Sequence, residues 1–168
     1  SLTKKQFSEL GAFYSNLGNV KFVNVLLESF YGKDEPKNRF IQRSIRGLLA
    51  GEKLDVTEGK QTRDYVLIND VIDALVFLGE TQNITNDFVC VPLGSGTSPS
   101  IREILEYLKV VCKSESKINF GAIPSRENEP STCADLTALR QLGFTKKMTF
   151  WKDGMKKIVE AIKNENLD

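Results

Sequence analysis

Apolar residues near the start of the chain change from helical to strand spacing. In residues 3–17 they recur every three or four positions, as on one face of an amphipathic helix, at Phe7, Leu10, Tyr14 and Leu17. Gly18 and its neighbouring asparagines predict the end of this helix. Residues 20–27 are mostly apolar and rich in valine, which is typical of a strand covered on both faces of a sheet.

The same two patterns alternate through the rest of the sequence. Strand-like runs occupy residues 54–57, 63–68, 88–93 and 117–120. Helical spacing predicts helices over residues 37–50, 71–78 and 136–142, another that starts at Ser100, and a last one that buries Trp151, Met155 and Ile162. Strands separated by helices in this order indicate an α/β protein.

Short polar signals mark where several of these helices begin. Ser100 and Glu103 match the S-x-x-E capping box, in which each residue satisfies a backbone N–H group of the first helical turn. Asp135 is expected to cap the helix 136–142, and Asn69 or Asp70 the helix 71–78, because their side-chain oxygens accept from free N–H groups.

Composition removes several classes of function. The 23 basic and 22 acidic residues nearly cancel and are interspersed, so no broad positive field exists to attract nucleic acid or an anionic membrane. The apolar runs are far shorter than the roughly 20 residues of a membrane span. Histidine is absent, which excludes Ser-His-Asp and Cys-His catalysis and most zinc chemistry. We therefore expect no nucleic acid, no membrane and no metal among the ligands.

The cysteines agree with a cytoplasmic protein. Cys90, Cys112 and Cys133 are far apart, odd in number and include no C-x-x-C pair. We expect them to be buried free thiols rather than disulfides or metal ligands.

Lys4 is the first candidate for chemistry. At about 100° per residue it falls beside Phe7, Gly11 and Tyr14 on the apolar side of the helix, whereas Lys5 points to the polar side. Either its aliphatic stem packs along the helix end, or its ammonium lowers the pKa of a neighbour or binds a cofactor hydroxyl. Spacing alone leaves both interpretations open.

Motifs that resemble one enzyme family run along nearly the whole sequence. Ser1-Leu2-Thr3-Lys4 resembles the end of a Y-x-x-x-K motif whose tyrosine would precede Ser1. Further matches are FVNVLLESFYG (22–32), GEKL (51–54), QTRDYV (61–66), GSG (94–96), SIRE (100–103), RENE (126–129) and LGF (142–144). In this order and spacing the chain resembles the NAD-dependent epimerase/dehydratase family, or extended short-chain dehydrogenases. Within it, the chain is similar to nucleotide-sugar 4-ketoreductases of the CDP-abequose and CDP-paratose synthase type.

The resemblance implies the C-terminal part of a Rossmann-type fold. Residues 1–35 and about 61–93 resemble edge elements of the parallel sheet, and residues 36–60 and 94–168 a small α/β substrate-binding lobe. The glycine-rich turn that binds NAD or NADP is expected in an N-terminal half outside this chain. The expected partner is a nucleotide-diphosphate sugar, and relatives often form homodimers through the helix of the Y-x-x-x-K motif.

The resemblance also implies roles at the reacting end of the site. Lys4 would bind the nicotinamide ribose and lower the pKa of the tyrosine, which exchanges a proton with the 4-oxygen of the sugar. Thr3 would lie near the same place, and Leu27 would pass its backbone near the nicotinamide. Leu27 is equally consistent with an ordinary core residue.

Substrate contacts are implied farther along the chain. Arg63 and Arg126 resemble two arginines that bind the pyrophosphate, a task that suits a permanently charged group with forked donors. Glu129 would accept from a ribose hydroxyl. Phe40, Leu54 and Val56 match positions that border the nucleobase. The alternatives are structural: Arg63 pairs with Asp64, Arg126 is a solvated charge, and the apolar residues belong to the core.

The chain departs from the family pattern at four places. Leu26, Ser29 and Lys33 replace the Arg, Asn and Pro of R-x-x-N-x-Y-G-P, and Pro92 replaces a frequent Asn. Ser29 falls at a substrate-binding position, which leaves the sugar open. The expected function is the substrate-binding half of a nucleotide-sugar 4-ketoreductase or 4-epimerase in polysaccharide precursor synthesis, inactive alone. The alternatives are a 4,6-dehydratase and a non-catalytic nucleotide-binding or oligomerisation module.

Overall fold

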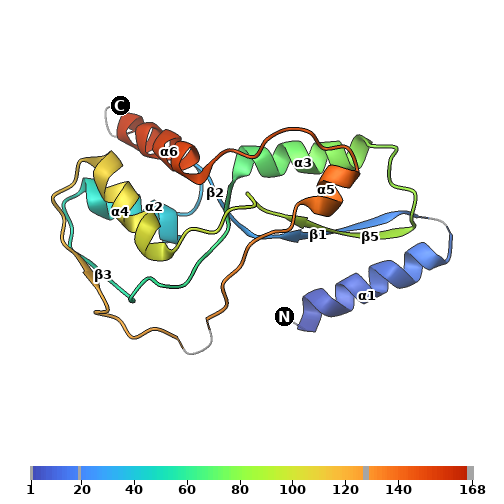
Figure 1. Ribbon diagram of the computed structural model, residues 1–168, viewed down its shortest axis with the longest axis horizontal. Coiled ribbons are helices and arrows are strands. Elements are labelled where there is room, and N and C mark those ends of the chain that lie inside the picture. The colour runs from blue at the N-terminus through green and yellow to red at the C-terminus, as the bar shows by residue number, and fades with distance from the viewer. Residues whose placement is uncertain (1, 19, 127–128, 166–168) are drawn as a thin grey trace.

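The computed structural model describes residues 2–18, 20–126 and 129–165, in which helices and strands alternate (Figure 1). The elements are α1 (Leu2–Asn16), β1 (Phe22–Leu27), β2 (Ser29–Tyr31), α2 (Phe40–Leu49), β3 (Leu54–Val56), β4 (Tyr65–Leu67), α3 (Ile68–Glu80), β5 (Phe88–Leu93), α4 (Ile101–Cys112), β6 (Ile118–Phe120), α5 (Thr137–Gln141) and α6 (Trp151–Glu165). Every predicted helix and strand is present, and β2 is additional.

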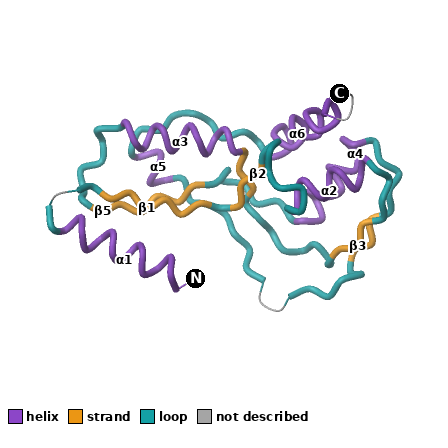
Figure 2. Tube along the Cα trace, turned by 180° about the vertical axis from the view of Figure 1, so that it is seen from behind, coloured by secondary structure: helices purple, strands orange, loops and turns teal. Residues whose placement is uncertain are grey.

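The strands form three separate parallel pairs, β1 with β5, β2 with β4, and β3 with β6. The parallel α/β architecture is therefore confirmed. α1 and α3 lie on opposite sides of the β1–β5 pair, and α2, α4 and α6 gather at the other end of the molecule (Figures 1 and 2). Among the described residues, no helix combines the length and apolar character needed to cross a lipid bilayer.

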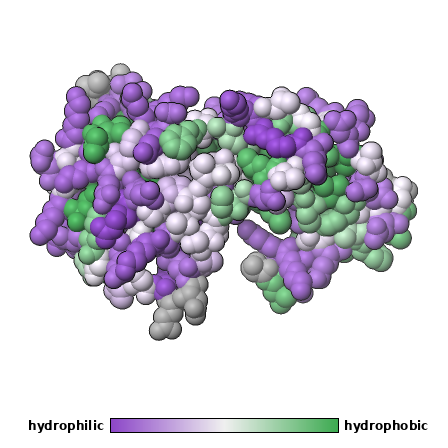
Figure 3. Space-filling view, in the orientation of Figure 1, coloured by the Kyte–Doolittle hydropathy of each residue, from purple (hydrophilic) through white to green (hydrophobic). Residues whose placement is uncertain are grey.

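Each end of the molecule has its own hydrophobic cluster. The first lies between α2, α4 and α6 and contains Ile45, Leu105 and Met155, all fully buried. The second lies between α3, β5 and α5 and contains Val91 and Leu139. In Figure 3, hydrophobic residues also reach the surface over this second region. β4 supplies Leu67 to the first cluster and Val66 to the second, and β2 supplies Tyr31 to the first, so β4 connects the two ends.

The structure confirms one predicted helix cap and changes the others. Ser100 and Glu103 form the capping box at α4. α3 begins at Ile68, so the prediction that Asn69 or Asp70 caps it is wrong. The buried Asp70 carboxylate instead accepts from the Thr149 backbone N–H at 2.7 Å and thereby ties α3 to the segment before α6.

Asp135 lies one residue before the N-cap position of α5, so the prediction that it caps this helix is wrong. Leu136 is the N-cap of α5. The Asp135 carboxylate accepts from the Thr137 backbone N–H at 2.9 Å and from the Thr137 hydroxyl at 2.6 Å, which fixes the turn that leads into the helix. The cysteines are free, as expected, but only Cys112 is buried, whereas Cys90 and Cys133 are exposed.

α1 packs against the strands through small residues rather than through its large apolar ones. Gly11 and Ser15 are buried, whereas Phe7 and Tyr14 are 61% and 56% exposed. A Cβ atom at Gly11 would lie 2.5 Å from the Phe22 ring, so only glycine permits this approach. The helix is therefore present as predicted and turns Gly11 of its apolar side to the strands. The large residues of that side stay mostly exposed, although the Phe7 ring centre lies 5.6 Å from that of Phe22.

The packing of α6 on Tyr31 gives a test of the fold. Tyr31 is fully buried, and a Cβ atom at Gly154 would overlap its hydroxyl. We expect Gly154→Ala to lower the free energy of unfolding by roughly 1–3 kcal/mol, as overpacking does. Gly79→Ala is the matched control, because Gly79 is also helical and a Cβ atom there meets nothing within 4 Å. It should gain up to about 1 kcal/mol. Urea unfolding measures both, and equal stabilities would contradict the packing.

Candidate functional site

A hollow of about 340 Å³ lies where the N-terminal turn of α1 meets the junction of β1 and β2. Four residues singled out in the sequence line it: Lys4, Leu27, Ser29 and Arg63. The other lining residues are Glu28, Phe30, Arg39 and Thr132. The fold thus brings together groups from five separate parts of the chain.

Strand pairing explains why the hollow forms here. β1 pairs with β5 up to Leu27, and after Glu28 the chain pairs with β4, starting at Ser29 opposite Tyr65. The chain therefore changes partner strand at the carboxyl end of β1. In open parallel α/β sheets, ligands bind outside the carboxyl ends of the strands. The position of the hollow follows from topology as much as from side chains.

Arg63 is held in place by the loop beyond β6. Its guanidinium lies 2.7 Å from a Glu129 carboxylate oxygen and also donates to the Pro130 carbonyl. Its side chain is 19% exposed, so one part of the guanidinium stays accessible. The alternative that Arg63 pairs with Asp64 is wrong, since Asp64 has other partners.

Asp64 is a fully buried carboxylate with four donors. It accepts from the backbone N–H groups of Ser95, Gly96 and Ala134 at 2.7–3.0 Å and from the Ser95 hydroxyl at 2.6 Å. A Cβ atom at Gly94 would overlap the carboxylate, so glycine is required there. The 94–96 turn therefore directs its N–H groups to Asp64 and not to a phosphate.

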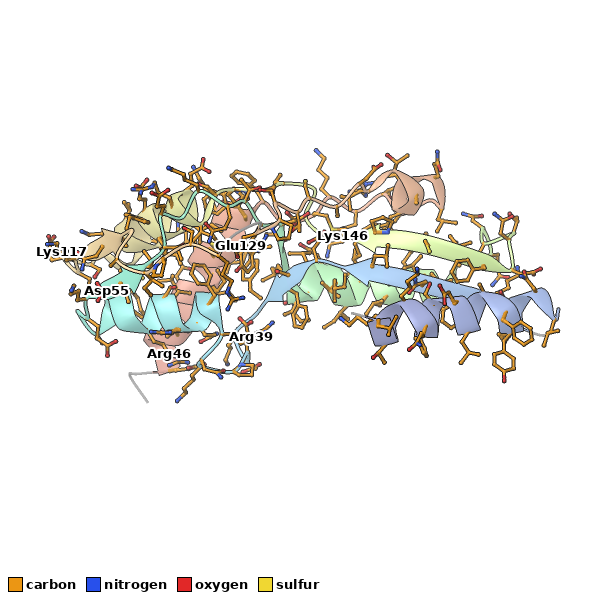
Figure 4. All side chains as sticks on the ribbon, turned by 90° about the horizontal axis from the view of Figure 1, so that it is seen from below. Arg39, Arg46, Asp55, Lys117, Glu129 and Lys146 are labelled. Carbon is orange, nitrogen blue, oxygen red and sulfur yellow. The ribbon has the colours of Figure 1, made fainter. Side chains whose placement is uncertain are left out.

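Arg39 adds a second guanidinium to the hollow. It donates to a Glu35 carboxylate oxygen at 3.2 Å, and the Glu35 side chain is only 8% exposed. The other Glu35 oxygen is buried without a hydrogen-bond partner in the described structure. Burial raises the pKa of the Glu35 carboxyl, and Arg39 partly opposes this rise. Figure 4 shows Arg39 and Glu129 in the middle of the molecule, between the α2 helix group and α1.

Aromatic residues adjoin both arginines in the chain, Phe40 after Arg39 and Tyr65 two residues after Arg63. Phe40 stacks on Tyr65 with ring centres 6.1 Å apart, and Tyr31 meets Tyr65 edge to face. Burial raises the pKa of Tyr65 to about 12, with Arg63 acting in the opposite direction. Phe40 thus packs against the first hydrophobic cluster and does not line the hollow itself.

Other predicted site residues lie outside the hollow. Thr3 is exposed on α1, and Arg126 is exposed on the loop beyond β6. Leu54 and Val56 lie in β3, at the end of the molecule far from α1 (Figures 1 and 4). They pack against the first cluster. Glu129 reaches the site through its ion pair with Arg63. The roles of these residues stay predictions.

Three polar lining residues were not singled out by the sequence: Glu28, Arg39 and Thr132. Glu28 had a visible signal, since it is a carboxylate directly after an apolar strand and between two candidate residues. Arg39 and Thr132 had none, because only the folded chain brings the start of α2 and the 129–132 segment next to Arg63.

A larger hollow of about 590 Å³ lies beside α5, lined by Gly96, Ala134, Asp135 and residues of the helix. Its cation, Arg140, donates to the carbonyl oxygens of Phe144 and Lys146 at 2.7 and 2.6 Å. This guanidinium holds its own loop, so the smaller hollow is the better candidate for an anionic ligand.

The structure is that of a parallel α/β protein with a charged hollow at the carboxyl end of a strand, the usual place for ligands in open α/β sheets. The model of the NAD dependent epimerase/dehydratase family matches residues 1–90. The chain is 29% identical over 165 residues to the CDP-abequose synthase of Salmonella typhimurium, covering 96% of this chain and 55% of that protein. For the CDP-abequose synthase of Salmonella muenchen the identity is 32%, covering 94% and 54%. The chain belongs to the NAD-dependent epimerase/dehydratase family.

Solved structures show the same fold. The UDP-glucose 4-epimerase from Thermotoga maritima matches with a TM-score of 0.84 and 18% identity, over 98% of this chain and 52% of that one. The UDP-glucuronic acid 4-epimerase from Bacillus cereus matches with a TM-score of 0.81 and 24% identity, over 94% and 50%. The chain spans about half the length of the curated relatives it matches.

The Asp64 network gives a second test. Asp64→Asn removes one of the two acceptor oxygens that serve buried N–H groups, so we expect a loss of at least about 2 kcal/mol in the free energy of unfolding. Asp34→Asn, at an exposed loop position, should change it by no more than about 0.5 kcal/mol. Urea unfolding measures both variants. A similar small change in both would show that the network does not hold the loops.

Glu35 gives a test that depends on pH. Its raised pKa means that the folded state binds the proton more tightly than the unfolded state. The stability this confers is present below the unfolded pKa and is lost as pH rises through the folded pKa. Glu35→Gln mimics the protonated acid, so its stability relative to the unmodified chain should increase from pH 4 to pH 7. Exposed Glu160→Gln is the control. Unfolding curves at both pH values decide, and a flat or opposite trend would refute the assignment.

Proposed function

We propose that this chain is the substrate-binding half of a nucleotide-sugar 4-ketoreductase or 4-epimerase in cytoplasmic polysaccharide precursor synthesis. The observation that carries the proposal is the hollow that Lys4 and Arg63 line together with Leu27 and Ser29. Separate cations suit a ligand that has a diphosphate as well as a reacting sugar.

Arg63 is the proposed anchor of the diphosphate. A guanidinium offers forked, permanently charged donors that match phosphate oxygens. In the structure, the Glu129 carboxylate pairs with this guanidinium. A bound diphosphate would take its place and leave Glu129 free to accept from a ribose hydroxyl. Arg39 lines the same hollow, and Arg126 comes from the same loop as Glu129.

Nucleobase contacts are proposed for Phe40, Leu54 and Val56. Phe40 is the best supported, because it begins α2 directly after Arg39 and stacks on Tyr65, which follows Arg63 closely in the chain. Leu54 and Val56 lie farther away in β3. Their contribution would come through the first hydrophobic cluster or through a movement of β3 on binding.

Lys4 and Leu27 are the proposed contacts at the reacting end. Both line the hollow, and the proposal puts a nicotinamide ribose beside them. When bound, NAD or NADP exchanges hydride with C4 of the sugar. The Lys4 ammonium would bind a ribose hydroxyl and lower the pKa of a tyrosine phenol, which exchanges a proton with the 4-oxygen. Thr3 lies next to Lys4 on α1.

The β1–β5 pair supports the proposal that a cofactor-binding half lies outside this chain. Within the described ranges, β1 pairs only with β5 and its other edge carries no strand. α1 and α3 flank this edge and expose large apolar side chains, including Phe7 on α1 and Ile72 and Val76 on α3. Another α/β unit could pair with β1 and cover both helices. We expect the chain to bind nucleotide sugar but not to turn it over alone.

Ser29 supports one alternative function. It lines the hollow at the position where the family pattern has Asn. A nucleotide-binding or oligomerisation module that has lost catalysis would also tolerate this change, and the exposed α1 face fits a homodimer. A 4,6-dehydratase would need further acid and base carboxylates outside this chain. A protein that contains both halves separates these functions, since only a reductase consumes NADPH with a 4-keto nucleotide sugar.

The diphosphate assignment is tested by calorimetric titration of the chain with UDP and CDP. Arg63→Ala should weaken binding at least about tenfold, because a charge-assisted hydrogen bond contributes roughly 1.5–3 kcal/mol. The melting temperature should stay nearly unchanged. Arg43→Ala, exposed on α2, is the matched control and should bind normally. Unchanged binding in Arg63→Ala would contradict the assignment, and a large fall in melting temperature would mean that Arg63 is structural.

A further inference from the structure

The hollow contains one carboxylate among its cations. Lys4, Arg39 and Arg63 line it, and Glu28 is the acid among the lining residues. A negative charge beside a proposed diphosphate site is unfavourable by Coulomb's law unless it serves another part of the ligand. Glu28 therefore needs a separate explanation.

Glu28 does not neutralise any of these cations. Arg63 pairs with Glu129, and Arg39 pairs with Glu35. No ion pair or side-chain hydrogen bond joins Glu28 to another residue in the part of the chain that the structure describes. Each arginine thus has its own acid, and the Glu28 carboxylate remains available to a ligand.

The backbone of Glu28 is fixed from both sides. Leu27 ends the pairing with β5, and Ser29 begins the pairing with β4. The Glu28 N–H donates to the Leu93 carbonyl at 2.9 Å. The residue is half-buried at the switch point and does not belong to a mobile surface loop.

The loop residues 132 and 133 lie close to this carboxylate. Thr132 lines the same hollow as Glu28. Burial, followed by the negative charges of Asp64 and Glu28, raises the pKa of the Cys133 thiol. The Glu28 carboxylate is therefore near a loop segment as well as at the end of β1.

We infer that Glu28 determines which sugars bind: its carboxylate accepts hydrogen bonds from uncharged hydroxyl groups and disfavours sugars that carry a carboxylate. This inference rests on the proposed function, which puts the diphosphate at Arg63 and the reacting carbon near Lys4, so that the sugar ring passes Glu28. An ionised carboxylate accepts hydrogen bonds and donates none, which suits a pair of hydroxyls. A second carboxylate at the same place is repelled, so the residue discriminates by exclusion as well as by attraction.

UDP-glucose and UDP-glucuronic acid test this inference, because they differ at C6 alone. Calorimetric titration of the chain should give a dissociation constant at least about tenfold lower for UDP-glucose. Both ligands carry the same uridine diphosphate, so the contribution of the base and the phosphates to binding cancels in the ratio of the two dissociation constants. In Glu28→Gln the ratio should fall below about threefold, mainly through tighter binding of UDP-glucuronic acid. Glu80→Gln, exposed at the end of α3, should keep the ratio of the unmodified chain.

Salt gives a second measurement that needs no variant. If the discrimination is electrostatic, the ratio for the unmodified chain should shrink between about 0.05 and 0.5 M sodium chloride, as screening increases. A ratio near one in the unmodified chain, a ratio that salt does not change, or a tenfold ratio that survives in Glu28→Gln would each overturn the inference. UDP alone separates the two proposals. If UDP binds and the ratio fails, only the role of Glu28 is wrong, and if UDP does not bind, the nucleotide site is wrong as well.

Discussion

The buried carboxylate of Asp64 connects the parts of the chain that form the site. It accepts from the turn that follows β5 and from the segment at Ala134, and it precedes β4 directly. The ends of two different strand pairs are thus joined at one point. A buried charge is stable only when donors surround it, so its four donors must hold their positions together. This constraint fixes the backbone at Arg63, which directly precedes Asp64 in the chain.

Opposite charges in the site explain how a nearly neutral protein can offer an anion-binding hollow. Arg63 and Arg39 are each paired with a carboxylate. These pairs limit the cost of bringing several cations together. A diphosphate would exchange with a carboxylate at Arg63 instead of meeting an isolated charge. The affinity then depends on the difference between the two pairings, which is smaller than the strength of either.

The arrangement of α1 shows how local pattern and tertiary contact can disagree. Its apolar spacing is that of a helix with a buried side, and the helix forms. Gly11 and Ser15 face the strands because the helix approaches Phe22 too closely for a larger side chain. The large apolar residues stay largely exposed, and Phe7 only borders the Phe22 ring. Together with the open edge of β1, they give this end of the molecule a surface suited to further protein.

Much of the fold was determined by the sequence alone. Periodicity located the helices and strands, because a helix and a half-buried strand repeat at different intervals, and the capping box at Ser100 depends on neighbours in the chain. β2 was missed, since three residues are too few to show a period. The caps at Asn69 and Asp70 were misplaced, because Asp70 bonds to a distant residue, Thr149.

The sequence likewise predicted one part of the site, and the tertiary structure decided the rest. Motif order in the sequence marked Lys4, Leu27, Ser29 and Arg63, and the fold brings them into one hollow. Only the tertiary structure decided that Glu28 and Arg39 share it, that Arg63 pairs with Glu129, and that β3 lies apart. The physical reason is distance along the chain. Local patterns report on interactions within a few residues, whereas these contacts depend on which strands pair and where the chain changes partner.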